Sequence, residues 1–95
     1  MIIPEEVKIG YKTFKVNMID ANVIDGNKVC YGTIQHDNGS INIATLYSED
    51  QQKCTFIHEC LHGIDDIVET ELTEDQVRKL AKGIYSFIID NENIF

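Results

Sequence analysis

The chain has 95 residues, 43% of them apolar, with one proline and a formal charge of −8. This size allows one compact domain, and the apolar content is typical of a folded globule. Its eight Lys and Arg residues are scattered, which argues against nucleic acid or an anionic membrane as a partner, because phosphate contacts need clustered positive charge.

The N-terminal segment, Met-Ile-Ile-Pro-Glu-Glu, lacks the basic start and apolar run of a signal peptide. No apolar stretch approaches the roughly 18 residues that a membrane span requires. Cys30, Cys54 and Cys60 are an odd number without zinc-knuckle spacing, which favours reduced, buried thiols over a disulfide framework. These features predict a soluble intracellular protein.

Residues 1–47 are predicted to be rich in β-strand. Val7 to Ile19 alternates apolar and polar residues, as a half-buried strand or hairpin does, and Gly10 marks a turn or bulge within it. A turn at Asp25-Gly26-Asn27 precedes a strand that is predicted over Lys28 to Gln35. A tight connection at residues 37–39 then leads to its antiparallel partner, Ser40 to Leu46.

Two helices are predicted over residues 48–69 and 73–91. Each opens with a hydroxyl residue that is followed three positions later by Gln, as at Ser48 and Thr73, a pattern typical of helix N-termini. Apolar residues then recur at intervals of three and four, which gives each helix one face to bury. These faces are expected to consist of Cys54, Ile57, Leu61, Ile64 and Val68 in the first helix, and of Val77, Leu80, Ala81, Ile84, Phe87 and Ile88 in the second. The last residues, Asn91 to Phe95, are predicted to form a tail.

The first helix carries the sequence His58-Glu59-Cys60-Leu61-His62, in which two histidines stand four residues apart. On a helix this spacing places both imidazoles on one face, within about 6 Å of each other, so they can share one ion. Zinc accepts neutral imidazole nitrogens, and a catalytic zinc site takes three protein ligands and a water. Glu59 would lie beside the ion, where it can accept a proton from that water and pass it to a leaving amine. The pattern therefore predicts a Zn²⁺ site with Glu59 as general base.

A third ligand must come from the acidic residues downstream. On a helical wheel, Glu74 lies at the rim of the second helix's apolar face, where the two helices meet, so it is our first choice, with Glu71 in reserve. Asp65 would reach the same ion only with strained geometry, and we expect it to hold an imidazole N–H instead. The expected metal ligands are therefore His58, His62 and Glu74, with Glu71 and Asp65 as the alternatives.

Three other polar residues are weaker candidates. His36 precedes the turn at residues 37–39 and is expected to be an exposed turn residue, with a ligand or transition-state donor as its alternative role. Tyr47 precedes the first helix and is the better of two candidate donors to an oxyanion. Tyr85 lies about 16 Å from Glu74 along the helix axis, at about 1.5 Å per residue, and is expected in the core.

The hairpin over Gly32 to Ile43, the run from Cys54 to His62 and the segment from Glu74 to Ala81 together resemble the ImmA/IrrE family of zincin metallopeptidases. The resemblance covers roughly residues 30–91. The chain departs from the family at Cys60 and Leu61, where Leu and Gly are common, and at Arg78, where Asn or Asp is usual. It is also similar to short proteins with the same His-Glu-x-x-His motif that phages and prophages encode.

The resemblance implies an α+β, minimal zincin-like fold in a single domain, residues 1–95. A small antiparallel or mixed sheet would precede an active-site helix and a C-terminal helix, and Glu74 would take the ligand role. It implies a gluzincin-like zinc peptidase that acts on a protein or peptide substrate in the cytoplasm of a bacterium or a phage-infected host. Ile41 to Ala44 would pair with an extended substrate backbone.

Two other interpretations stay open. The first is a zincin-like protein with weak or no catalysis that binds a regulatory protein partner, with zinc as a structural staple or absent. The second is a domain whose histidines are fortuitous. The sequence gives no prediction of the oligomeric state, although an edge strand in a small sheet offers a route to dimers.

Overall fold

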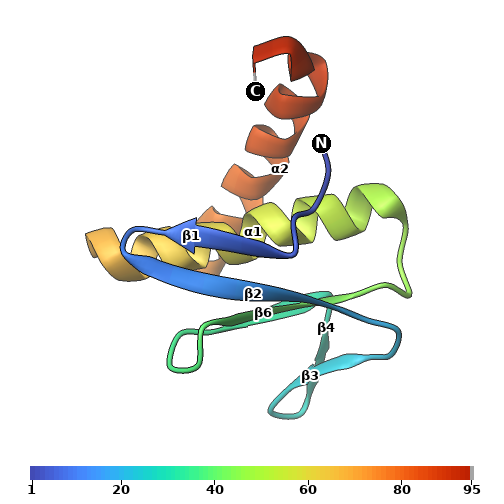
Figure 1. The fold of residues 1–95 in the computed structure, drawn as a ribbon, viewed down its shortest axis with the longest axis vertical. Helices are drawn as coiled ribbons and strands as arrows, with labels where there is room; N and C mark the ends of the chain where they lie inside the picture. The colour runs from blue at the N-terminus through green and yellow to red at the C-terminus, as the bar shows by residue number, and fades with distance from the viewer. Residues whose placement is uncertain (95) are drawn as a thin grey trace.

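In the computed structural model, which describes residues 1–94, strands make up the first half of the chain and helices the second. The strands are β1 (Glu6–Ile9), β2 (Lys12–Ile19), β3 (Val23–Asp25), β4 (Lys28–Cys30), β5 (Gly32–Gln35) and β6 (Ser40–Ala44). The helices are α1 (Glu49–Val68) and α2 (Glu74–Asp90), followed by a 3₁₀ turn, η1 (Glu92–Ile94). Figure 1 shows α1 lying along the sheet and α2 climbing away from it. The α+β class is therefore confirmed.

The main sheet is mixed, with the strand order β1-β2-β6-β5. β2 pairs with β6 in parallel, and the two outer pairs, β1–β2 and β5–β6, are antiparallel. Phe14, Val16, Ile41 and Ile43 alternate with polar residues and are buried in one core with the apolar side chains of α1. This alternation is the period-two pattern that the sequence predicts for a sheet with one covered face.

The opposite face of the sheet is polar. Asn17 of β2 donates a side-chain hydrogen bond to the carbonyl of the Asn42 side chain in β6, at 3.1 Å. The Asn42 amide in turn donates to the hydroxyl of Thr33 in β5, at 3.4 Å. The apolar face of the sheet is the one that α1 covers.

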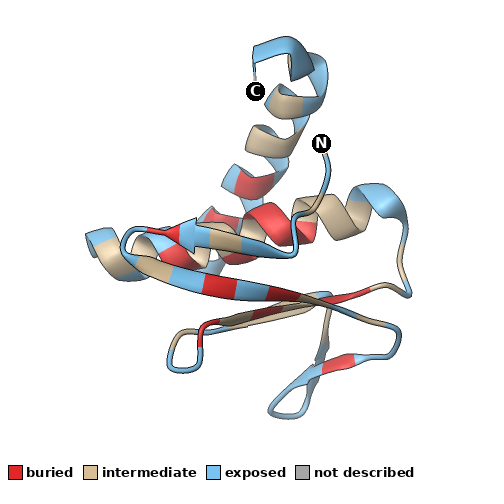
Figure 2. Ribbon diagram, viewed as in Figure 1, coloured by how far each residue is buried: buried red, intermediate tan, exposed pale blue. Residues whose placement is uncertain are grey.

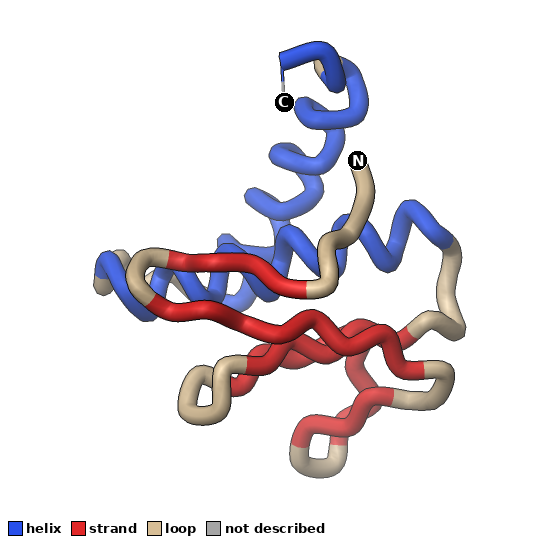
Figure 3. Tube along the Cα trace, viewed as in Figure 1, coloured by secondary structure: helices blue, strands red, loops and turns tan. Residues whose placement is uncertain are grey.

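The predicted strand over Lys28 to Gln35 is wrong as a single element, because it breaks at Tyr31 into strands of two different sheets. β4 pairs with β3 in a two-stranded ribbon, whereas β5 pairs with β6 in the main sheet. The Tyr31 carbonyl accepts a hydrogen bond from the Ala44 amide at 2.9 Å, and this bond holds the point at which the chain passes from β4 to β5. Figure 3 shows the ribbon projecting from the main sheet.

The segment from Val7 to Ile19 is a hairpin, and Gly10 lies in its turn at a φ of 63°. A side chain at this position would be strained, because the backbone is left-handed and Ile67 of α1, whose Cδ1 would lie 2.6 Å from the Cβ, would have to move. The turn at residues 25–27 joins β3 to β4, and the connection at residues 37–39 joins β5 to β6, as expected.

Both helices begin as predicted. The Ser48 side chain accepts a hydrogen bond from the Gln51 amide, and Thr73 forms a complete capping box with Gln76. Such caps satisfy backbone N–H groups that have no partner within the helix. The predicted tail is partly wrong, because residues 92–94 form η1. Phe95 lies outside the described residues.

The predicted buried faces are too long. Ile64 and Val68 of α1 are 45% and 56% exposed, and Leu80 and Phe87 of α2 are 46% and 54% exposed. The buried residues of α2 are Val77 and Ala81, both near its start. The reason is the steep path of α2, which leaves its outer side and the end of α1 uncovered (Figure 2). Periodicity predicts which side of a helix is apolar, but not how far a neighbour covers it.

The three cysteines are free and half-buried, whereas the sequence analysis expected full burial. Among residues 1–94, no helix combines the length and the apolar character that crossing a bilayer would need.

Candidate metal centre

The two histidines of α1 and the first residue of α2 meet at one point. His58 and His62 stand one helical turn apart, and their ring centroids are 4.9 Å from each other. Glu74 is placed opposite them because α1 ends at Val68 and the capped start of α2 returns the chain within five residues. Of the acidic residues weighed as third ligand, only Glu74 joins this group within residues 1–94.

The donor atoms of this group are close to the spacing that one ion needs. Glu74 Oε1 lies 2.7 Å from His58 Nε2, and Glu74 Oε2 lies 2.9 Å from His62 Nε2. The two Nε2 atoms are 3.2 Å apart. Ligands at about 2.0–2.1 Å from a tetrahedral zinc ion are about 3.3 Å from one another. The three atoms would have to move apart by about 0.1–0.6 Å to hold an ion, and two imidazoles with one carboxylate are a known donor set of catalytic zinc sites.

The environment of His58 favours the neutral imidazole. Burial lowers its pKa below the usual value, and the positive charge of Arg78 acts in the same direction. The hydrogen bond to Glu74 opposes this change and is outweighed by burial. A neutral imidazole is the form that coordinates a metal ion.

Glu59 is buried although it carries a carboxylate, with only 6% of its surface exposed. Burial raises its pKa to about 8, and the negative charges of Glu74 and Asp25 add to the effect. An acid with a pKa near neutrality can both accept and return a proton, which is the property that a general base and acid requires. A positive ion held by the neighbouring histidines would favour its ionised form.

A glycine in β5 allows the sheet to approach α1 beside Glu59. A Cβ at Gly32 would lie 2.6 Å from the Thr55 methyl group and 2.7 Å from the Asn42 carbonyl oxygen. The same Cβ would be 3.7 Å from Cγ of Glu59. Gly32 therefore lets β5 close over this part of α1, and the close approach contributes to the burial of Glu59.

Asp65 and Glu71 belong to the connection between the helices. The Asp65 carboxylate accepts hydrogen bonds from the Thr70 hydroxyl and from the Leu72 amide, and these bonds lower its pKa. Asp65 therefore orders the connection, whereas the sequence analysis expected it to hold an imidazole N–H. Glu71 is exposed, with a φ of 57°, and is not part of the metal-binding group.

The group of His58, His62 and Glu74 opens into a cleft of about 730 Å³. Its walls are α1, the first half of α2, β5 and the β3–β4 ribbon. His36 lines the cleft, and its Nδ1 atom is buried without a hydrogen-bond partner, 3.6 Å from the Asp66 carboxylate. This position is compatible with the alternative role of His36 as a ligand or a transition-state donor.

The two tyrosines proposed as oxyanion donors lie elsewhere. Tyr47 packs edge-on against Tyr31, with the ring centroids 4.5 Å apart, and Tyr85 donates a hydrogen bond to Asp50. Neither residue lines the cleft. Tyr85 is partly buried and packs against the core, which agrees in part with its expected position.

The strand that was expected to pair with substrate is internal. β6, which contains Ile41 to Ala44, is hydrogen-bonded to β2 on one side and to β5 on the other. The free edge beside the cleft belongs to β5, Gly32–Gln35. The sequence could not show this, because the parallel pairing of β2 with β6 joins segments that are far apart in the chain.

The sequence analysis gave the basic residues of the cleft no role there. Arg78 and Lys82 line it, and both follow Glu74 at intervals of four. That spacing was a usable signal, since residues four apart share one face of a helix. Asp25 and Lys28 reach the cleft from the β3–β4 ribbon, and no local pattern indicated this.

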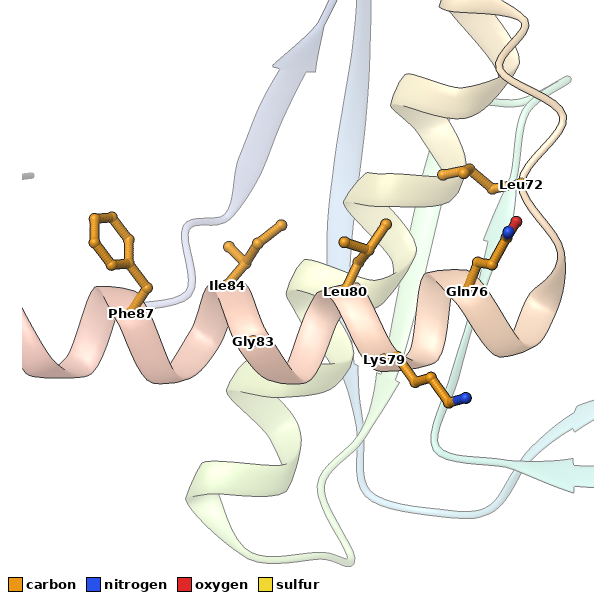
Figure 4. Close-up of a pocket in the computed structure, with 7 residues that line it drawn as sticks. All are labelled: Leu72, Gln76, Lys79, Leu80, Gly83, Ile84 and Phe87. Atoms are coloured by element: carbon orange, nitrogen blue, oxygen red, sulfur yellow. The ribbon is translucent and has the colours of Figure 1, made fainter.

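A second hollow, of about 570 Å³, lies along α2 and contains none of these groups. Figure 4 shows Leu72, Leu80, Ile84 and Phe87 in a row on one side of the helix. At 100° per residue, Leu80, Ile84 and Phe87 lie about 80–140° around α2 from Glu74, so they border a different part of the surface. The titratable chemistry therefore belongs to the cleft.

Comparison with protein-family models, with curated proteins and with solved structures gave no significant match. The functional argument therefore rests on the residues of the cleft.

Proposed function

We propose that this protein is a zinc-dependent peptidase in which His58, His62 and Glu74 hold the ion and Glu59 moves protons. The observation that carries the proposal is a buried carboxylate beside a set of three donor atoms in an open cleft. Burying an unpaired carboxylate is unfavourable for folding, and perturbed carboxylates of this kind are concentrated at functional sites.

A bound zinc ion would supply Lewis acidity, which lowers the pKa of water and polarises a peptide carbonyl. Glu59 accepts the proton that the attacking water releases. It then donates this proton to the leaving amine, which a carboxyl with a raised pKa can do near neutral pH. The walls of the cleft exclude part of the solvent and so strengthen these interactions.

A peptide substrate would bind in an extended conformation along β5. An edge strand offers unpaired backbone groups to which another strand can be added. The free edge of β5 borders the cleft beside α1, which supports this placement.

The test compares the wild type with Glu59→Gln after both proteins are loaded with zinc. Loss of the proton carrier should lower peptide hydrolysis at least about 100-fold while the zinc content stays the same. Glu71→Gln is the matched control, because it removes an exposed carboxylate outside the metal-binding group, and it should leave hydrolysis unchanged.

Hydrolysis that survives Glu59→Gln would contradict the assignment of the general base. A wild type that binds zinc but cleaves no peptide would favour the alternative function, a zincin-like protein that binds a regulatory partner. In that case removing zinc should lower stability, because the energy of metal binding contributes to folding.

A further inference from the structure

The charged side chains that line the cleft balance one another, whereas the whole chain is strongly acidic. The protein carries a formal charge of −8, yet Lys28, Arg78 and Lys82, three of its eight basic residues, line the cleft. The acidic residues that line it are Asp25, Glu59 and Glu74. Under the proposed function, Glu59 transfers protons and Glu74 binds the metal ion. Three cations and one anion then face a bound substrate.

Two of these cations have no ion-pair partner in the part of the chain that the structure describes. Lys53 pairs with Glu49, and Lys79 and Arg78 share Asp75. Lys28 and Lys82 form no such pair within residues 1–94. An unpaired ammonium group in a cleft keeps its full attraction for an incoming carboxylate, and converging walls of low dielectric strengthen this attraction.

The basic residues of α2 form a row that leads away from the metal-binding group. Glu74, Arg78 and Lys82 are four residues apart, so they share one helical face, and Arg78 and Lys82 lie about 6 and 12 Å from Glu74 along the axis. Both basic residues line the cleft together with His58 and Cys54 of α1.

We infer that the cleft selects acidic peptides, with Arg78 and Lys82 binding Asp or Glu side chains on one side of the scissile bond. This inference rests on the proposed function for the position of that bond. Arg78 and Lys82 would reach these side chains from the α2 wall of the cleft, while the peptide backbone lies along β5. Lys28, at the turn of the β3–β4 ribbon, adds positive charge from the facing wall.

The first experiment maps the cleavage sites of the zinc-loaded protein in a peptide library of mixed sequence. The wild type should cut sites that are enriched in Asp and Glu on one side of the cut. Lys82→Glu should lower kcat/KM for these peptides about three- to ten-fold, through KM, because it replaces an exposed attraction by a repulsion. Lys82→Arg should retain the preference.

The matched control is Lys8→Glu, which makes the same change of charge in β1. Lys8 is also exposed and without an ion pair among residues 1–94, but it lies on the opposite edge strand of the main sheet. It should change the cleavage profile far less than Lys82→Glu. The preference of the wild type should also weaken as salt is raised, because exposed charges are screened.

The second experiment measures binding without cleavage. Zinc-loaded Glu59→Gln is titrated against a labelled Ala-Gly peptide that carries a run of aspartates, and against the counterpart with asparagines. The aspartate peptide should bind several-fold more tightly, and Lys82→Glu in the same background should remove most of that difference.

The outcomes separate the two proposals. If no peptide is cleaved but the aspartate peptide binds in a manner that depends on Lys82, the peptidase proposal fails and the acidic preference stands. If peptides are cleaved without acidic enrichment, or if Lys82→Glu changes no more than Lys8→Glu does, the acidic preference is overturned and the peptidase stands. If the protein neither cleaves nor binds these peptides, both proposals fall.

Discussion

Within a single turn, α1 buries two side chains with opposite effects on stability. Phe56 is 8% exposed and packs into the apolar core under the helix, while Glu59 is 6% exposed at the cleft. Burying an aromatic ring stabilises the fold, whereas burying a carboxylate without a partner destabilises it. The stability that the apolar core provides therefore offsets the cost of burying Glu59 at the cleft.

The core side of this comparison should give the largest effect on stability. Phe14 is 1% exposed beneath α1. Replacing it with Ala should lower the free energy of unfolding by about 3–5 kcal/mol, because it removes buried apolar surface and leaves a cavity. Denaturant unfolding of the metal-free protein measures this change, and Ile43→Val, which should lose about 1 kcal/mol, extends the test if Phe14→Ala does not fold. A loss below 1 kcal/mol for Phe14→Ala would contradict the view that this core provides most of the stability.

Replacing the buried carboxylate of the cleft should raise the stability, whereas truncating the core lowers it. Metal-free Glu59→Gln should be more stable than the metal-free wild type by on the order of 3 kcal/mol at pH 8. The pKa of Glu59 rises from 4.5 to about 8 on folding. Between these values the unfolded chain releases a proton that the folded protein keeps, so the wild type loses stability as the pH rises. Below the lower value the difference should vanish.

Thermal unfolding of both proteins across this pH range, with a chelator present, tests the sign. Equal stability at every pH would show that burial of Glu59 has no cost. A wild type more stable than Glu59→Gln at pH 8 would show that Glu59 has a partner in solution.

Two glycine variants test how closely β5 packs against α1. Gly32→Ala should destabilise the protein by about 2 kcal/mol, because its Cβ would meet Thr55 and a backbone carbonyl, and the widened cleft should also lower hydrolysis. Gly83→Ala is the control, since a Cβ there meets nothing within 4 Å. It should stabilise α2 by about 1 kcal/mol. Similar changes in both variants would argue against close packing of β5 on α1.

The smallest effect is expected where α1 ends. Glu69 adopts a left-handed conformation at a φ of 57° and adds a negative charge at the C-terminal end of the helix. Glu69→Gly should raise the free energy of unfolding by about 1 kcal/mol, because it relieves both effects. Glu69→Gln removes the charge alone and should give a few tenths of a kcal/mol. Denaturant titration distinguishes the two variants, and a loss of stability in Glu69→Gly would contradict this account.

Local signals in the sequence were sufficient to predict the two helices and the grouping of His58, His62 and Glu74. The hydroxyl and Gln pairs at Ser48 and Thr73 placed both helix starts, because capping depends on neighbouring residues alone. The spacing of His58 and His62 fixed their shared face. The wheel position of Glu74 was enough to choose it over Glu71 and Asp65.

Features that depend on long-range packing could not be predicted from the sequence. The break at Tyr31 and the parallel pairing of β2 with β6 follow from how distant segments pair, and no local pattern encodes that choice. The burial of Glu59 likewise depends on Gly32 of another element. The exposed Leu80 shows the same limit, because an apolar stripe does not reveal where a neighbouring element stops covering it.

The most direct test of the central claim is the zinc content of reloaded protein, measured by metal analysis after dialysis. The wild type and Glu59→Gln should each retain one ion per chain, and His58→Ala should retain none, because it removes one of three ligands. A wild type without zinc, or a His58→Ala variant that keeps a full equivalent, would contradict the assignment of His58, His62 and Glu74 as a metal site.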